Sequence, residues 1–235
     1  MVKIYQIGVL PAFMNGIYEG DIPFNKIEKL GDLGLGTVNG LKGELVVLDG
    51  DYYQMDESGR ASKVNPLDAT PFTIVTKLTS FKTVSLEHIN NLDEVSKCIE
   101  KVMDTPNVFY MFRIDGVFSD VHLRSEHCEM MTHQPLYELL PSIQKKFTLE
   151  KSEGTIVGTF CPAYSAGFTI QNFHYHYINR DRTFGGHVFD VKIEHAILKL
   201  QKSHEFDLQV FQTPDFYQCS LDVDMQAALK KVEND

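Results

Sequence analysis

The sequence has no long hydrophobic run and little cysteine. Its N-terminal segment contains one lysine and a short apolar stretch broken by Pro11, followed by acidic residues, so we expect neither a signal peptide nor a membrane span. The cysteines are widely spaced and form no CxxC pair: Cys98, Cys128, Cys161 and Cys219. This pattern is typical of free thiols in a reducing compartment, and it predicts a cytoplasmic protein.

Positive charge is also scarce, because 22 Lys and Arg residues stand against 32 Asp and Glu residues. The formal net charge is −10 and the sequence pI is about 5.3. A surface this acidic repels phosphate backbones and anionic lipid headgroups, which argues against nucleic acid or a membrane surface as a partner. An anionic small-molecule substrate would need a local basic group to overcome the general field.

The chain of 235 residues is long enough for one large domain or two small ones. Strand-like runs separated by turn signals dominate it, and helical patterns are interspersed among them. We therefore predict an α+β fold with mixed, largely antiparallel β-sheets and flanking helices. The predicted arrangement has two domains of the α/β type: a β-rich N-terminal domain over 1–150 and a C-terminal domain over 151–235, which carries a histidine-rich hairpin and a C-terminal helix.

Local patterns define the individual elements. The Asp49-Gly50-Asp51 turn signal predicts a β-hairpin between 44–48 and 52–54. Further strands are predicted over 72–78, 108–114, 155–160, 168–176, 187–193 and 207–211. Helices are predicted over 91–103, with Asn90 or Asn91 as N-cap, over 136–145 and over 223–232. Pro141 lies inside the second helix, so a shorter helix starting at Pro141 is an alternative.

The most informative stretch is 173–191, FHYHYINRDRTFGGHVFDV. Side chains on a strand alternate between faces, so His174 and His176 share one face and the aromatic residues beside them point the other way. Residues 179–186 are polar and glycine-rich, which suits a reversing loop that places His187 opposite His176. Opposed residues have Cβ atoms roughly 4.5–5.5 Å apart. Three imidazoles can therefore converge on one zinc ion at a distance of about 2.0–2.1 Å.

Three neutral imidazoles would leave a zinc ion its full charge and an open position. This is the arrangement of a catalytic metal, whereas a structural zinc ion is normally closed by four protein ligands. No cysteine lies close in sequence to complete such a set, although Cys161 or Cys219 could approach in the fold. His-X-His also occurs by chance on strands, so the hairpin alone leaves a metal-free sheet with exposed histidines as an alternative.

Three segments resemble the alpha-acetolactate decarboxylase family, and they occur in the family's order along most of the chain. They are 31–54, GDLGLGTVNGLKGELVVLDGDYYQ; 118–124 with Gln134-Pro135-Leu136-Tyr137 after it; and 154–190, GTIVGTFCPAYSAGFTIQNFHYHYINRDRTFGGHVFD. The chain has Leu136 where the family typically has a more proline-rich run. The resemblance implies an enzyme, a carboxy-lyase that converts 2-acetolactate to acetoin and carbon dioxide. It also implies a homodimer.

The same resemblance implies a set of site residues. Zinc is the implied cofactor, with His174, His176 and His187 as its ligands. The implied active site further contains Thr37 and Arg124 as substrate-binding residues, and Glu44, Arg124 and Glu233 as catalytic residues. Outside the family context each has a plain structural alternative: Glu44 an exposed charge on a hairpin edge, Arg124 a surface partner of Glu126 or Asp120, Thr37 a turn or N-cap residue, and Glu233 a solvated helix end.

The implied chemistry is consistent with these residue types. Loss of carbon dioxide leaves two electrons that must move onto the ketone oxygen, and zinc as a Lewis acid would stabilise the resulting enediolate. We hypothesise that Glu44 and Glu233 then protonate it on one face. No organic cofactor is needed, in agreement with the absence of a GxGxxG or P-loop motif. The alternatives are a three-histidine zinc hydrolase or hydratase, and a non-catalytic small-molecule or DNA-associated binding module; the net charge argues against DNA.

Overall fold

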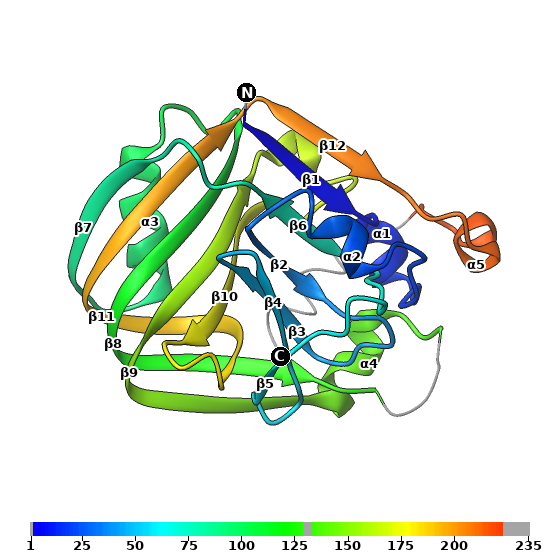
Figure 1. The fold of residues 1–235 in the computed structure, drawn as a ribbon, viewed down its shortest axis with the longest axis horizontal. Coiled ribbons are helices and arrows are strands. Elements are labelled where there is room, and N and C mark those ends of the chain that lie inside the picture. The colour runs from blue at the N-terminus through cyan, green and yellow to red at the C-terminus, as the bar shows by residue number, and fades with distance from the viewer. Residues whose placement is uncertain (1, 129–132, 223–235) are drawn as a thin grey trace.

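Two β-sheets organise the chain in the computed structural model, which describes residues 2–128 and 133–222 (Figure 1). A seven-stranded sheet has the order β12 (Glu205–Gln209), β1 (Lys3–Ile7), β6 (Thr73–Thr76), β2 (Leu33–Thr37), β3 (Glu44–Leu48), β4 (Asp51–Met55), β5 (Ala61–Lys63). A five-stranded sheet has the order β10 (Asn172–Asn179), β9 (Gln144–Cys161), β8 (Phe109–Glu126), β11 (Gly185–Ser203), β7 (Lys82–Ile89). Within these sheets every pair of neighbouring strands is antiparallel except β1 and β12.

Short helices flank the two sheets: α1 (Leu10–Met14), α2 (Phe24–Ile27), α3 (Leu92–Val102), α4 (Leu136–Ile143), the 3₁₀-helix η1 (Ala163–Ser165) and α5 (Pro214–Gln218). The helix predicted over 91–103 is confirmed as α3, whose N-cap Asn91 accepts a hydrogen bond from the backbone N–H of Glu94. Its apolar residues Val95 and Ile99 are fully buried against the five-stranded sheet. The helix predicted over 223–232 lies outside the described residues.

Helix α4 is shorter than predicted and contains the proline. It spans Leu136–Ile143 and includes Pro141, so the alternative of a helix starting at Pro141 is wrong. A proline in a helix interior removes one backbone donor and clashes with the carbonyl group one turn earlier. Here only two residues follow Pro141 before the helix ends, and Leu136, Leu139 and Leu140 are buried before it. Packing of these leucines therefore stabilises a helix that contains Pro141 close to its C-terminal end.

Strands β8, β9 and β11 are far longer than the predicted strands, at 18, 18 and 19 residues, and they bend sharply (Figure 1). Register shifts along β11 supply part of this bend. Gly116 allows a close approach between strands, because it pairs with Gly154 on one side and Ala196 on the other, and a Cβ there would lie 2.4 Å from the Ala196 Cβ. Since β10 also pairs with β11, the strands β8, β9, β10 and β11 close into a ring.

The alternation of side chains decides which face of each sheet meets the other. Tyr175 and Tyr177 of β10 pack into the apolar cluster that includes Val95 and Ile99 of α3, and the Tyr175 hydroxyl lies 2.7 Å from Ser96 Oγ. Ile178, on the opposite face of β10, packs instead with apolar side chains of β2 and β3. The histidine-bearing face of β10 is therefore turned toward the seven-stranded sheet.

The predicted fold class and the predicted free thiols agree with this architecture. The fold combines largely antiparallel sheets with flanking helices, as the α+β prediction requires. The two-domain division stays a prediction, and strand β9 runs through residue 150. The four cysteines form no disulfide, as expected. In the described part of the chain, no helix combines the length and apolar character needed to cross a membrane.

Candidate active site

The three candidate histidines lie side by side on two paired strands. His176 of β10 is directly opposite His187 of β11, which confirms the predicted register. His174 lies two residues away on the same strand and therefore on the same face. The pairing is local, since residues 180–184 reverse the chain and Asn179 Oδ1 accepts hydrogen bonds from the backbone N–H groups of Thr183 and Phe184.

The imidazole nitrogens of these histidines converge on one point. His174 Nε2 lies 3.2 Å from His176 Nε2 and 3.2 Å from His187 Nδ1. One nitrogen from each ring lies within 4.8 Å of the others, a spacing that could hold a metal ion. His174 and His176 are also buried, with His176 only 1% exposed, and His187 is half-buried. The arrangement is consequently not that of metal-free histidines exposed on a sheet surface.

Protonation and hydrogen bonding prepare these rings to act as ligands. Burial, followed by the positive charges of neighbouring groups, lowers the pKa of His174 and His187 well below the ordinary value. Burial likewise lowers the pKa of His176 to about 4, so all three are neutral at pH 7. His176 Nδ1 lies 2.8 Å from the Leu45 carbonyl oxygen and donates to it, which leaves the Nε2 lone pair aimed at the other rings. Three neutral donors meeting in this way fit a divalent cation.

Glu44 and Thr37 enter the site from the seven-stranded sheet. They are paired neighbours on β2 and β3, and both are buried. Glu44 is 8% exposed and its Oε2 lies 3.2 Å from His176 Nε2, so its alternative as an exposed charge on a hairpin edge is wrong. The Thr37 hydroxyl donates to the Gly43 carbonyl oxygen at 2.7 Å. Because a hydroxyl has one proton, Thr37 can only accept a hydrogen bond from a molecule in the site.

Arg124 supplies the local positive charge that the acidic surface lacks. It lies on β8 directly opposite His187, and its Nη2 is 3.4 Å from His187 Nε2. Its exposed fraction is 9%, and Asp120 pairs with Lys192 at 3.0 Å, so Arg124 is not a surface partner of Asp120. The guanidinium interacts instead with the buried carboxyls of Glu44 and Glu126.

Glu126 is a site residue that the sequence reasoning missed. It follows Arg124 by two positions on β8, is 5% exposed, and shares a hydrogen bond with Glu44. Burial and the neighbouring carboxyl raise the pKa of Glu44 well above its ordinary value, and burial raises the pKa of Glu126, while Arg124 opposes both shifts. Two carboxyls can share a hydrogen bond only if one keeps a proton. Residues two apart on a strand share a face, so the position of Glu126 relative to Arg124 could have indicated that both side chains enter the site.

A cavity between the two sheets brings these groups together. Its volume is about 610 Å³, including the space at its mouth. Apolar side chains form most of its wall: Leu10, Phe13, Met14, Phe72, Leu136, Leu140 and Ile170. Its polar lining consists of Thr37, Glu44, Arg124, Glu126, His174 and His187. Small-molecule sites commonly combine an apolar wall with a few convergent polar groups in this way.

The structure thus brings six of the seven sequence-predicted site residues into one place. They come from strands β2, β3, β8, β10 and β11, and their closest approach is at the His176 Nε2 atom. The seventh, Glu233, lies beyond the described part of the chain, so its role stays a prediction. Together the six groups can hold a cation, bind a small anion and carry a proton.

Sequence comparison finds relatives along nearly the whole chain. A family model described as alpha-acetolactate decarboxylase matches residues 4–223. The alpha-acetolactate decarboxylase of Bacillus subtilis (strain 168) is 33% identical over 220 residues, which cover 94% of this chain and 86% of the relative. The protein of the same name from Methanosarcina mazei is 34% identical over 230 residues, covering 98% of this chain and 80% of the relative.

Structural comparison gives the same result. The crystal structure of the alpha-acetolactate decarboxylase from Bacillus subtilis strain 168 is similar to this fold with a TM-score of 0.94 and 32% identity, covering 98% of this chain and 99% of the other. A Staphylococcus aureus structure, described as a protein of unknown function similar to alpha-acetolactate decarboxylase, has a TM-score of 0.91 and 25% identity, covering 99% of each chain.

Proposed function

The chain belongs to the alpha-acetolactate decarboxylase family of carboxy-lyases, and from this premise we propose that it converts 2-acetolactate to acetoin and carbon dioxide with the aid of a zinc ion. The proposal depends on one observation above all. Three neutral imidazole nitrogens converge beside a buried arginine and two buried carboxyls at the wall of a largely apolar cavity. Decarboxylation of a small anionic keto acid requires groups of these kinds: a cation site to stabilise developing negative charge, a basic group to bind the anion and a carboxyl to donate a proton.

In this proposal His174, His176 and His187 hold the metal. When bound, zinc would act as a Lewis acid toward the ketone and hydroxyl oxygens of the substrate, and so stabilise the negative charge that develops as carbon dioxide leaves. The histidines contribute no charge of their own, because burial keeps them neutral. The hydrogen bond from His176 Nδ1 to the Leu45 carbonyl oxygen fixes the orientation of one ring and raises its basicity.

Arg124 and Thr37 would bind and orient the substrate. The Arg124 guanidinium is the cationic group of the cavity wall and can donate hydrogen bonds to a carboxylate or hydroxyl oxygen. Thr37 can accept a hydrogen bond from the substrate hydroxyl, because its own proton is given to Gly43. Binding the carboxylate equally tightly throughout would slow its loss, so the Arg124 contact is more useful where it strengthens as charge moves onto the oxygens.

Glu44 would deliver the proton that replaces the lost carboxyl group. It adjoins both His176 and Glu126, and the hydrogen bond between the two carboxyls keeps one proton inside the site. Burial favours the protonated form, whereas Arg124 and a bound dication favour the ionised one. A carboxyl balanced in this way can give up a proton and recover it at neutral pH. Glu233 is proposed to share this duty from the C-terminal segment.

An acetolactate assay before and after metal removal tests the proposal. The purified protein should release carbon dioxide and form acetoin, lose at least 95% of that activity after chelation and dialysis, and recover it when one equivalent of zinc is added. Metal content is measured by mass spectrometry on the same samples. Turnover of esters without release of carbon dioxide from acetolactate would instead identify a three-histidine hydrolase. Protein that purifies without metal and binds none would favour a binding module.

Replacing Arg124 with alanine should lower kcat/KM by about a hundredfold or more while zinc content stays near one per chain. The reason is that Arg124 supplies a charge-assisted contact to substrate oxygens worth roughly 3 kcal/mol, yet is not among the proposed ligands. Lysine at this position should recover only part of the activity, because it cannot reproduce the planar fork of a guanidinium. Parallel loss of zinc and activity would contradict this role.

The proposal carries two further expectations about the whole protein. We propose a homodimer, which light scattering coupled to size-exclusion chromatography would test, and a cytoplasmic location. No membrane or nucleic-acid partner is proposed, because the chain has a formal net charge of −10.

A further inference from the structure

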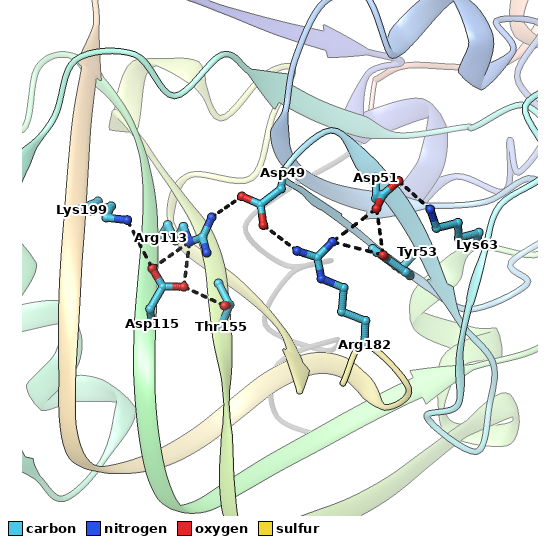
Figure 2. Close-up of polar contacts among 9 residues, drawn as sticks. All are labelled: Asp49, Asp51, Tyr53, Lys63, Arg113, Asp115, Thr155, Arg182 and Lys199. Carbon is cyan, nitrogen blue, oxygen red and sulfur yellow. Dashed lines mark hydrogen bonds and ion pairs between the residues drawn. The ribbon is translucent and has the colours of Figure 1, made fainter. Parts of the chain in front are cut away.

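The loop between the two histidine strands is tied to the opposite sheet by a cluster of charged side chains. Arg182, at the tip of this loop, donates to Asp49 Oδ2 at 2.5 Å and to the Tyr53 hydroxyl at 3.1 Å, and lies 3.4 Å from Asp51 Oδ2. Figure 2 shows the Arg182 guanidinium reaching across to the turn between β3 and β4, with Asp49 on one side and Tyr53 on the other. The loop belongs to the five-stranded sheet, and its partners belong to the seven-stranded one.

Asp49 connects this arginine to a second one. Its Oδ1 accepts from Arg113 Nη1 at 2.6 Å, while Arg113 Nε donates to Asp115 at 2.7 Å (Figure 2). One carboxylate therefore bridges Arg113 of β8 and Arg182 of the hairpin loop. The side chains of Arg113 and Arg182 are 20% and 29% exposed, and the Asp49 carboxylate that they share is 49% exposed, so solvent partly screens the two ion pairs. We call Arg113, Asp49 and Arg182 the clamp.

The backbone around the clamp fixes the same contact. The Ala61 N–H donates to the Thr183 carbonyl oxygen and the Gly185 N–H to the Gly59 carbonyl oxygen, each at 2.8 Å. Arg182 itself has a φ of +57°, a conformation that costs energy for a residue with a side chain. The loop keeps this conformation while its arginine is engaged across the sheet boundary. The contact between the hairpin loop and the seven-stranded sheet is therefore held by backbone hydrogen bonds as well as by the side chains of the clamp.

The position of the clamp along β3 links it to the active site. Asp49 follows Glu44 by five residues, and between them the Leu45 carbonyl oxygen accepts the hydrogen bond of His176 Nδ1. Strand β3 is therefore joined to the histidine hairpin at two points, one at the site and one at the loop. The three proposed metal ligands lie on one sheet, whereas Glu44 and Thr37 lie on the other. Their relative placement depends on how these two sheets are held together.

We propose that Arg182, acting through Asp49 and Arg113, is a positioning residue that holds Glu44 at its working distance from the histidine cluster. The inference rests on the proposed function. The surface hollow beside Arg113, Arg180 and Arg182 is not proposed as an anion site, because each of these guanidiniums pairs with a carboxylate. The charge of the clamp serves to join two sheets.

Arg182→Ala should lower kcat by about tenfold to a hundredfold, with KM changed less than threefold, because small displacements of a catalytic group lower rates by this much. Zinc content should stay that of the wild type, since all three proposed ligands lie on the hairpin strands. The matched control is Arg180→Ala in the same loop. Arg180 pairs with Glu153 of its own sheet, its side chain is 71% exposed, and its loss should change kcat less than twofold.

A cycle with Glu44 separates positioning from a general structural role. In a Glu44→Gln background, Arg182→Ala should change kcat less than twofold, because the group to be positioned is already disabled. Arg182→Lys should restore part of the rate of the alanine variant. Circular dichroism at the assay temperature shows whether each variant is folded. If Arg182→Ala is unfolded, the kcat of Arg182→Lys is compared with those of the wild type and Arg180→Ala instead.

Three results would overturn the proposal: equal effects of the Arg180 and Arg182 variants, multiplicative effects of Arg182→Ala and Glu44→Gln, or loss of zinc from Arg182→Ala, which would place the defect at the metal. Wild-type protein that releases no carbon dioxide from acetolactate would instead contradict the proposed function. In that case a double-mutant cycle between Arg182 and Asp49, measured by urea unfolding, still tests the clamp, and additive effects would refute it.

Discussion

His176→Ala is expected to lower kcat/KM for acetolactate at least a thousandfold and to release the metal during dialysis. His176 is the most buried of the three histidines, and its Nε2 approaches both His174 Nε2 and the Glu44 carboxyl. Its removal would leave two ligands and a cavity beside them, too few for a stable zinc site. A thousandfold loss corresponds to about 4 kcal/mol of transition-state stabilisation, within what a Lewis-acidic metal supplies. Carbon dioxide release and zinc content are measured on the same preparation.

The matched control is His195→Ala. His195 lies on β11, the strand that carries His187, but its side chain is exposed and outside the cavity. It should therefore retain full activity and one zinc ion per chain. Wild-type rates in the His176 variant, or activity surviving the loss of zinc, would show that the histidine cluster does not carry the reaction.

Glu44→Gln is expected to lower kcat by about a hundredfold to ten-thousandfold, the usual contribution of a positioned proton donor. Glutamine keeps the size and hydrogen-bonding capacity of the side chain but cannot exchange a proton, so zinc should remain bound. If Glu233 shares the duty, Glu44→Gln combined with Glu233→Gln should lower kcat further and erode the handedness of the acetoin formed. Chiral gas chromatography measures the product, and stopped-time assays of acetoin measure the rate.

Glu150→Gln provides the comparison, because Glu150 is an exposed glutamate on β9. It should leave rate and handedness unchanged. The proton-transfer hypothesis fails if the double variant of Glu44 and Glu233 keeps both the rate and the handedness of the wild type. Retained zinc in the Glu44 variant is part of the test, since a carboxyl 3.2 Å from His176 Nε2 could affect the metal directly.

The lengths of the strands were the weakest part of the prediction from sequence. The predicted strand over 108–114 is the first part of β8, which continues to Glu126. Beyond Ile114 the strand contains Asp115, Gly116 and Asp120, residues that favour turns when read locally. In the structure Asp115 is paired with Lys199 and accepts a hydrogen bond from Thr155 on the neighbouring strands, and Asp120 is paired with Lys192. These contacts come from tertiary pairing and cannot be read from a short window of sequence.

The histidine hairpin is encoded locally in the chain. Alternation along one strand and a polar, glycine-containing reversal fix His174, His176 and His187 on one face, because both effects act over a few residues. The sequence also predicted the α+β class and limited the N-cap of α3 to Asn90 or Asn91, of which the structure has Asn91. Arg124 and Glu44 could be singled out only through resemblance to a family, since nothing near either residue in the chain predicts burial.

The way in which the two sheets meet depends on long-range packing. Glu44 is 130 positions from His174 in the chain, yet their strands are brought together by the apolar cluster between the sheets and by the Leu45 and Asp49 contacts. The same packing buries Glu126 against Glu44 and leaves them to share a hydrogen bond. Such placements depend on the sum of many distant contacts, so local propensity does not encode them.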